Sequence, residues 1–193
     1  NGISVSGAYP NFTINGANFW RTTGNSGLNE AINFLGTTDA VDLVFRAGNI
    51  EGMRLDNATR RLGLGTISPT AKLHVNSAAL EDALRVQTNG TTRLFVNADG
   101  NMGINTLSPE ANLHVFRGSA GAVTANGNSP LVVENNTSNF ISLLTPDANE
   151  KGILFGDATD NSDGGIIYNS SNSMQFRTNG NTTRMTLNSL GDL

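Results

Sequence analysis

A sequence motif that occurs twice constrains the fold of this chain more than any other feature. It reads GLGTISPTAKLHV at residues 63–75 and GINTLSPEANLHV at residues 103–115. Both histidines of the chain, His74 and His114, lie at equivalent positions within it. The motif predicts either a metal-binding or catalytic histidine that is used twice, or one structural unit of a repeating scaffold.

The repeat extends beyond this motif. Residues 45–75 and 86–115 align with small gaps, and a third copy begins at residue 176. Each copy predicts the same order of elements: strand, Asn/Gly turn, strand, Gly turn, strand, Ser-Pro, strand. Apolar and polar residues alternate in these segments, as at Leu94 and Val96, which is typical of strands with one buried face.

Turn-forming residues separate the expected strands. Asn-Gly at residues 89–90 and 179–180 predicts hairpin turns that need positive φ. Pro69 and Pro109 have no N–H to donate to a strand ladder, so each predicts a break in the sheet. A serine before each proline also suits one short helical turn that the serine caps.

Gly63 and Gly103 lie between apolar residues inside predicted strands. Glycine weakens a strand, so its presence there needs a physical reason. We expect the close approach of another backbone at both positions. In a multi-chain fibre that backbone can belong to a sister subunit.

The segments between the copies follow similar rules. We expect strands at 152–155, 165–168 and 173–178, and two more within 32–46. Residues 79–86, which read ALEDALRV, are the only helical candidate.

No clean domain linker is visible, and we expect three regions along the chain. These are an N-terminal β module at 1–60, a tandem-repeat shaft segment at 61–117, and a C-terminal β module at 118–193 that ends in an incomplete third copy. The small, turn-rich stretch 118–130 marks the second boundary.

The composition argues for a thin fold. Hydrophobic residues make up 37% of the 193 residues and charged residues only 15%. This is too little apolar material for a thick globular core, and abundant Asn, Gly, Ser and Thr favour short strands and turns over helices. The sequence therefore predicts an all-β, elongated fold that buries its apolar face against copies of itself.

Charge and composition exclude several classes of partner. The net charge is −4 and no basic patch is visible, so we expect no nucleic acid partner. No apolar run is long enough to span a membrane, so we expect no membrane insertion. The chain has no cysteine, which excludes disulfides and zinc–thiolate sites.

The repeated motif resembles a pattern common in phage tail fibres and related appendage proteins. There it typically reads G-N-V-G-I-G-T-x-x-P-x-x-x-L-H-V, which GNMGINTLSPEANLHV at residues 100–115 matches. A preceding F-x-T-N-G-x-x-R-M-x-I run is matched by residues 176–185. The chain departs from the family at Gly52, where arginine is usual, and at Asn105, where glycine is usual.

The resemblance implies a homotrimeric β-rich shaft, often followed by an intramolecular chaperone domain that cleaves itself off. The implied function is that of a structural tail-fibre protein on a phage or a phage-like contractile injection particle. Such a protein is located on the virion or the extracellular particle and supports attachment to a host or target cell. Its implied partners are further copies of itself, a baseplate or adaptor protein, and a host-surface glycan.

The histidines are the natural metal candidates, because three copies of one imidazole can gather on a three-fold axis. No Asp, Glu or second histidine lies near either one at ligand spacing. The acidic segment 157–165 does not have the spacing of an EF-hand calcium loop. We therefore expect packed or hydrogen-bonded histidines at 74 and 114, with no metal and no cofactor.

A glycan-binding receptor-recognition module is the main alternative function. Its candidate residues are Phe19 and Trp20, because exposed aromatic side chains stack on sugars, although a lone tryptophan more often lies in a core or an interface. A tailspike-type polysaccharide depolymerase is the less favoured alternative. No nucleophile elbow, zinc motif or P-loop is present and no carboxylates form a recognisable pair, so we expect no catalytic residue and no enzyme.

The third copy stops in mid-pattern. Aligned on the second copy, Leu193 falls on Met102. We therefore expect the parent gene to continue with glycine, Ser-Pro and Leu-His-Val, and to encode a tip or chaperone domain later.

Overall fold

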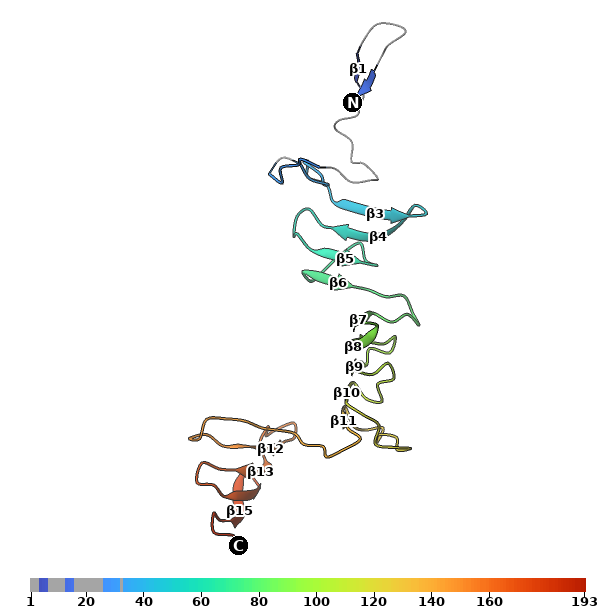
Figure 1. Cartoon of the computed structure of the whole chain (residues 1–193). Helices are drawn as coiled ribbons and strands as arrows, with labels where there is room; N and C mark the ends of the chain where they lie inside the picture. Colours follow the sequence, from blue (N-terminus) through green and yellow to red (C-terminus); the bar gives the residue numbers. More distant parts are fainter. Residues whose placement is uncertain (1–3, 7–12, 16–25, 32) are drawn as a thin grey trace. The chain divides into compact units, whose positions relative to one another are not determined.

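The computed structural model describes residues 4–6, 13–15, 26–31 and 33–193, which form an all-β protein (Figure 1). The strands belong to four separate sheets. In these residues we find no helix, and so none that is long and apolar enough to cross a membrane. The chain divides into two compact units, residues 1–134 and 135–193.

The first unit contains a short hairpin and two larger sheets. The hairpin pairs β1 (Ser4–Ser6) with β2 (Thr13–Asn15). The second sheet consists of β3 (Leu43–Ala47), β4 (Ile50–Leu55), β5 (Leu62–Leu64) and β6 (Leu73–Val75). The third consists of β7 (Leu84–Thr88), β8 (Thr91–Val96), β9 (Met102–Ile104), β10 (Leu113–Phe116) and β11 (Leu131–Glu134).

The second unit is one antiparallel sheet in which each strand pairs with the next. Its strands are β12 (Lys151–Phe155), β13 (Gly164–Tyr168), β14 (Met174–Thr178) and β15 (Thr182–Leu187). The three strands predicted in this region are confirmed to within one residue at each end.

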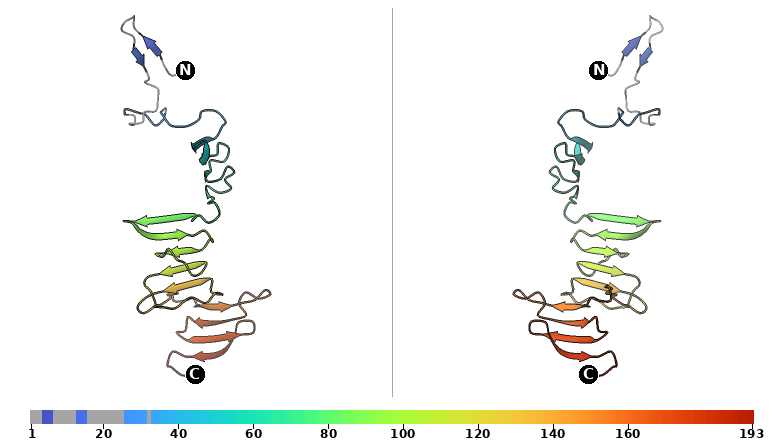
Figure 2. Two further views of the ribbon diagram at one scale, coloured as in Figure 1. Left: turned by 90° about the vertical axis from the view of Figure 1, so that its right-hand side faces the viewer. Right: turned by 90° about the vertical axis from the view of Figure 1, so that its left-hand side faces the viewer.

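The β3–β6 and β7–β11 sheets share one topology. Each begins with three antiparallel strands and then adds a parallel one, β6 or β10. The parallel strands are joined by the short connections 65–72 and 105–112, which run across one face of their sheet. Only the β7–β11 sheet has a further parallel strand, β11, beyond this point (Figure 2).

Each of the three sequence copies starts with a hairpin, β3–β4, β7–β8 or β14–β15, and each hairpin has a β-bulge at the same place. The register shifts after Phe45 in β3, after Val86 in β7 and after Phe176 in β14. The predicted positive φ at the Asn-Gly turns is confirmed, with 49° at Asn89 and 75° at Gly90. A bulge increases the local twist and fixes the register of the pairing strand.

Both departures from the family pattern lie at these bulges or next to them, and the local geometry explains the one at Asn105. The extra residue of the bulge is Gly52 in β4 and Arg93 in β8, and its carbonyl accepts the N–H of Gly65 or Asn105, each at 3.1 Å. Gly65 has φ of 69° and Asn105 has φ of 59°. Asparagine tolerates this left-handed conformation better than most residues, so Asn105 preserves the turn.

Three local predictions were wrong. Residues 79–86 are not helical, because Leu84 onward pairs with β8 and residues 78–81 form a turn. Only one strand, β3, lies in the described part of 32–46. No helical turn forms at either Ser-Pro, where the N–H of Ser68 or Ser108 is instead bound by the hydroxyl of Thr66 or Thr106, at 3.2 and 3.1 Å.

The buried part of the β7–β11 sheet is small and lies on one face. Phe95 and His114 are 4% and 2% exposed, and Ala111 of the connection 105–112 is buried with them. In the described residues the other buried apolar side chains are those of Ile167 in β13 and Pro69 in the connection 65–72. The connections 65–72 and 105–112 therefore cover one face of the β3–β6 sheet and of the β7–β11 sheet, and they leave the other face of each uncovered.

Candidate functional site

The uncovered face of the β3–β6 sheet is entirely apolar. Across the strands Phe45 lies opposite Met53, Met53 opposite Leu64, and Leu64 opposite Val75. The second row of the same face consists of Leu43, Leu55, Leu62 and Leu73 in register. None of these eight side chains is buried.

The β7–β11 sheet has a matching face. One row consists of Val86, Leu94, Ile104, Val115 and Val133, and the other of Leu84, Val96, Met102, Leu113 and Leu131. None of these ten side chains is buried, and Leu131 is 49% exposed. Each residue stands directly opposite an apolar neighbour, so the face is continuous across all five strands.

The β12–β15 sheet repeats the arrangement with one charge at its end. Its exposed apolar face includes Ile153, Ile166, Phe176 and Met185 in register. The Lys151 ammonium at the end of this face lies 5.3 Å from the centroid of the Tyr168 ring. These three surfaces, one on each of the three larger sheets, are called the apolar faces below.

Glycine lets the connection approach the opposite face of each sheet. A Cβ atom at Gly63 would lie 2.7 Å from the carbonyl oxygen of Thr66, and one at Gly103 would lie 2.6 Å from that of Thr106. The close backbone approach expected from the sequence is therefore present, but the approaching backbone belongs to the same chain and not to a sister subunit. Pro69, which is buried, and Pro109 lie in these connections.

His114 joins three segments on the covered face. Its Nδ1 accepts the N–H of Glu110 at 3.4 Å, so Nε2 carries the hydrogen and donates to the Glu134 carboxylate at 3.1 Å. The other oxygen of Glu134 accepts the N–H of Ala120 at 2.7 Å. This contact with β11 was missed in the sequence because Glu134 is twenty residues away.

His74 makes only the first of these contacts. Its Nδ1 accepts the N–H of Thr70 at 3.2 Å. No residue in the described part of the chain is bonded to its Nε2, because β6 has no neighbour equivalent to β11. Nowhere in that part do three His, Cys, Asp or Glu side chains come together in a group able to hold a metal ion.

Replacing the histidines tests their structural role. We expect His114→Gln to cost about 1–3 kcal/mol of unfolding free energy, because it breaks hydrogen bonds of a buried group. His74→Gln should lower the free energy of unfolding by less, because His74 is only half-buried. Thermal unfolding of each variant measures the difference, and the double variant should stay folded with unchanged metal content. Stoichiometric metal in the wild type that is lost in the double variant would contradict this role.

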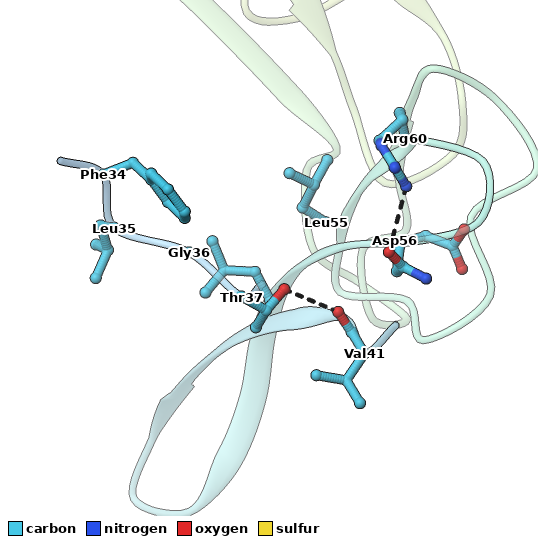
Figure 3. Close-up of a pocket in the computed structure, with 10 residues that line it drawn as sticks. Phe34, Leu35, Gly36, Thr37, Val41, Leu55, Asp56 and Arg60 are labelled. Carbon is cyan, nitrogen blue, oxygen red and sulfur yellow. Dashed lines mark hydrogen bonds between the residues drawn. The ribbon is translucent and has the colours of Figure 1, made fainter. Parts of the chain in front are cut away.

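A shallow pocket adjoins the apolar face of the β3–β6 sheet (Figure 3). It has a volume of about 270 Å³, and Phe34, Leu35 and Val41 line it together with Leu43 and Leu55 of the apolar face. On its polar rim, the Asp56 carboxylate accepts the N–H and the hydroxyl of Thr59, both at 2.7 Å. The carboxylate is thus already hydrogen-bonded, and the pocket extends the apolar face.

Phe19 and Trp20, the candidate glycan residues, lie outside the described residues.

Four carboxylates are stabilised in their charged form. The hydrogen bond from Arg54 lowers the pKa of Glu51, and the Thr59 hydroxyl lowers that of Asp56. The hydrogen bond from Arg177 lowers the pKa of Glu150, and backbone N–H groups of Thr159 and Asp160 lower that of Asp157. These bonds fix loops and strand ends in place.

Acid should therefore destabilise the protein. A carboxylate with a lowered folded-state pKa contributes stability above its unfolded pKa, about 4 for Asp and Glu, and this contribution is lost as pH falls through the folded value. We expect the melting temperature to decrease once the pH is lower than about 4. Glu150→Gln should reduce this fall, whereas Glu30→Gln, at an exposed position, should not. An equal pH profile in both variants would contradict a role for the Glu150–Arg177 pair.

The chain matches no model of a known protein family and no curated protein. Function is therefore inferred from the residues themselves, above all from the three apolar faces.

Proposed function

We propose that this chain is a shaft segment of a homotrimeric fibre on a phage tail or a related contractile injection particle. Its role is structural: it holds a recognition tip away from the particle and transmits attachment to the host or target cell. A baseplate or adaptor protein and a host-surface glycan are the expected partners of the complete fibre.

The observation that carries this proposal is the apolar face on each sheet. A monomer normally covers such a face with a helix or a second sheet. Here the connections cover the opposite face, where Gly63 and Gly103 lie. Copies of the same chain are a suitable cover, because each brings the same apolar faces in the same order along the sequence.

The exposed surface of the chain supports the same conclusion. In the described residues thirty large hydrophobic side chains are exposed, and twelve of them belong to the three apolar faces. Association therefore has ample surface to bury.

The shared local geometry supports a shaft built from units. The bulge, the left-handed residue after β5 or β9, and the histidine–backbone bond recur with the same partners in both large sheets of the first unit. Repeating one unit lengthens a fibre without new packing solutions. With three chains, the three copies of each apolar face meet around a common axis, and an elongated rod results.

The mass in solution tests the proposal. Light scattering of the purified chain should give about three times 20.3 kDa, and electron microscopy should show rods. A mass of 20.3 kDa at micromolar concentration would overturn it. Binding of the isolated chain to a glycan array would favour the recognition module, and release of sugar from host polysaccharide would favour the depolymerase.

A further inference from the structure

The two larger sheets of the first unit end in four edge strands, β3, β6, β7 and β11, and in the described residues each of these pairs on one side only. In the described residues β6 pairs only with β5, and β7 pairs only with β8. Open edges present unpaired N–H and C=O groups and are normally protected. The edges of β6 and β7 are therefore candidates for pairing with another strand.

The β7–β11 sheet shows how such an edge is completed. The strand β10, equivalent to β6, pairs in parallel with β11, with Leu113 opposite Leu131 and Val115 opposite Val133. Glu134 then reaches back to His114, at 3.1 Å. The added strand thus supplies apolar residues to one face and a hydrogen-bond acceptor for histidine on the other.

The edge strand β7 has a sequence that suits the position beside β6, which is equivalent to the position of β11 beside β10. Its sequence LRVQ resembles LVVE of β11: apolar residues at Leu84 and Val86, then Gln87 in place of Glu134. In the register of β10 and β11, Leu73 would lie opposite Leu84 and Val75 opposite Val86. That register continues the apolar face across the junction, and it places the Gln87 side chain where Glu134 stands relative to His114.

We propose that in the assembled fibre β6 of one copy pairs in parallel with β7 of a second copy, in this register. The inference rests on the proposed homotrimer. Each junction then links two chains by backbone hydrogen bonds, and the amide oxygen of Gln87 accepts from His74 Nε2.

In the described residues the chain's own β7 does not pair with β6, and the connection between them forms other hydrogen bonds. The N–H of Glu81 donates to Ala78 O at 3.1 Å, and the N–H of Ala83 donates to Val96 O at 2.9 Å. Residues 78–83 therefore form a turn and extend the hydrogen bonding between β7 and β8. The connection 65–72, which does join parallel neighbours, runs across its sheet instead.

Disulfide trapping tests the pairing, since the chain has no cysteine of its own. In the proposed register Asn76 stands opposite Gln87, within the Cα separation that a disulfide spans. The variant Asn76→Cys with Gln87→Cys should form covalent dimers and trimers on oxidation, which reduction reverses. The matched control, Asn76→Cys with Thr88→Cys, moves the second thiol to the other face and should remain uncrosslinked.

Five outcomes decide the matter when light scattering is run on the same samples. Crosslinked chains in a trimer, absent from the control, support the pairing. A trimer without crosslinks, or one crosslinked equally in the control, overturns it and leaves the homotrimer standing. A disulfide within one chain shows that β6 takes its own β7, which also overturns it. A mass of one chain overturns both this inference and the proposed function.

Discussion

Gly103→Ala is expected to lower the free energy of unfolding by about 3 kcal/mol. The new Cβ would lie 2.6 Å from Thr106 O and 3.0 Å from the Thr106 methyl carbon. The first contact is with backbone, which cannot rotate away, so the connection 105–112 must shift from the sheet. Overpacking of this kind typically costs 1–3 kcal/mol, or more where relaxation is blocked. Chemical denaturation followed by circular dichroism measures the change.

Gly52→Ala is the matched control. Gly52 also lies in a strand, but no atom is within 4 Å of a Cβ placed there. The equivalent bulge positions hold Arg93 and Arg184, which shows that a side chain fits. We expect this variant to be neutral or to gain up to about 1 kcal/mol, because alanine loses less entropy than glycine. If Gly103→Ala melts at or above the wild-type temperature, the close approach at residue 103 imposes no constraint.

Leu131→Asp is expected to abolish assembly while leaving the single chain folded. Leu131 is 49% exposed in the isolated chain, so a carboxylate there remains hydrated. In the trimer the same position would bury three carboxylates on the apolar face, at a cost of several kcal/mol each. Light scattering should give the 20.3 kDa of one chain, with an unchanged circular dichroism spectrum.

Ser108→Asp makes the same charge change on the opposite side of this sheet. Ser108 is exposed in the connection 105–112, away from the apolar face. Its variant should assemble like the wild type. Full assembly of Leu131→Asp would show that the apolar face of the β7–β11 sheet is not the surface through which copies meet.

Alternation and turn chemistry were sufficient to predict most strands. Leu94 and Val96 face one side as expected, and Asn89-Gly90 forms the turn its φ preference indicates. The parallel direction of β6 and β10 was not predicted, because alternation specifies faces and not strand direction. The helix expected at 79–86 failed because pairing of Leu84 with Val96 outweighs the weak helical preference of Ala, Leu and Glu.

The candidate site was harder to predict than the fold. The sequence pointed to His74 and His114, whose surroundings differ because only His114 has β11 beside it. Glu134 is distant in sequence, and nothing local marks it as a partner. A close backbone was expected at Gly103, with its chain left open, and it belongs to Thr106, only three residues away, because the connection turns back over its own strand.

The uncovered faces also bear on how the protein is made. A newly synthesised chain that folds its sheets alone displays apolar surface that also suits unintended partners, so correct association competes with aggregation. Association of three chains is of higher order in concentration than folding of one. The yield of native fibre is therefore set by how quickly copies meet in register, and synthesis of several chains on neighbouring ribosomes would favour the productive route.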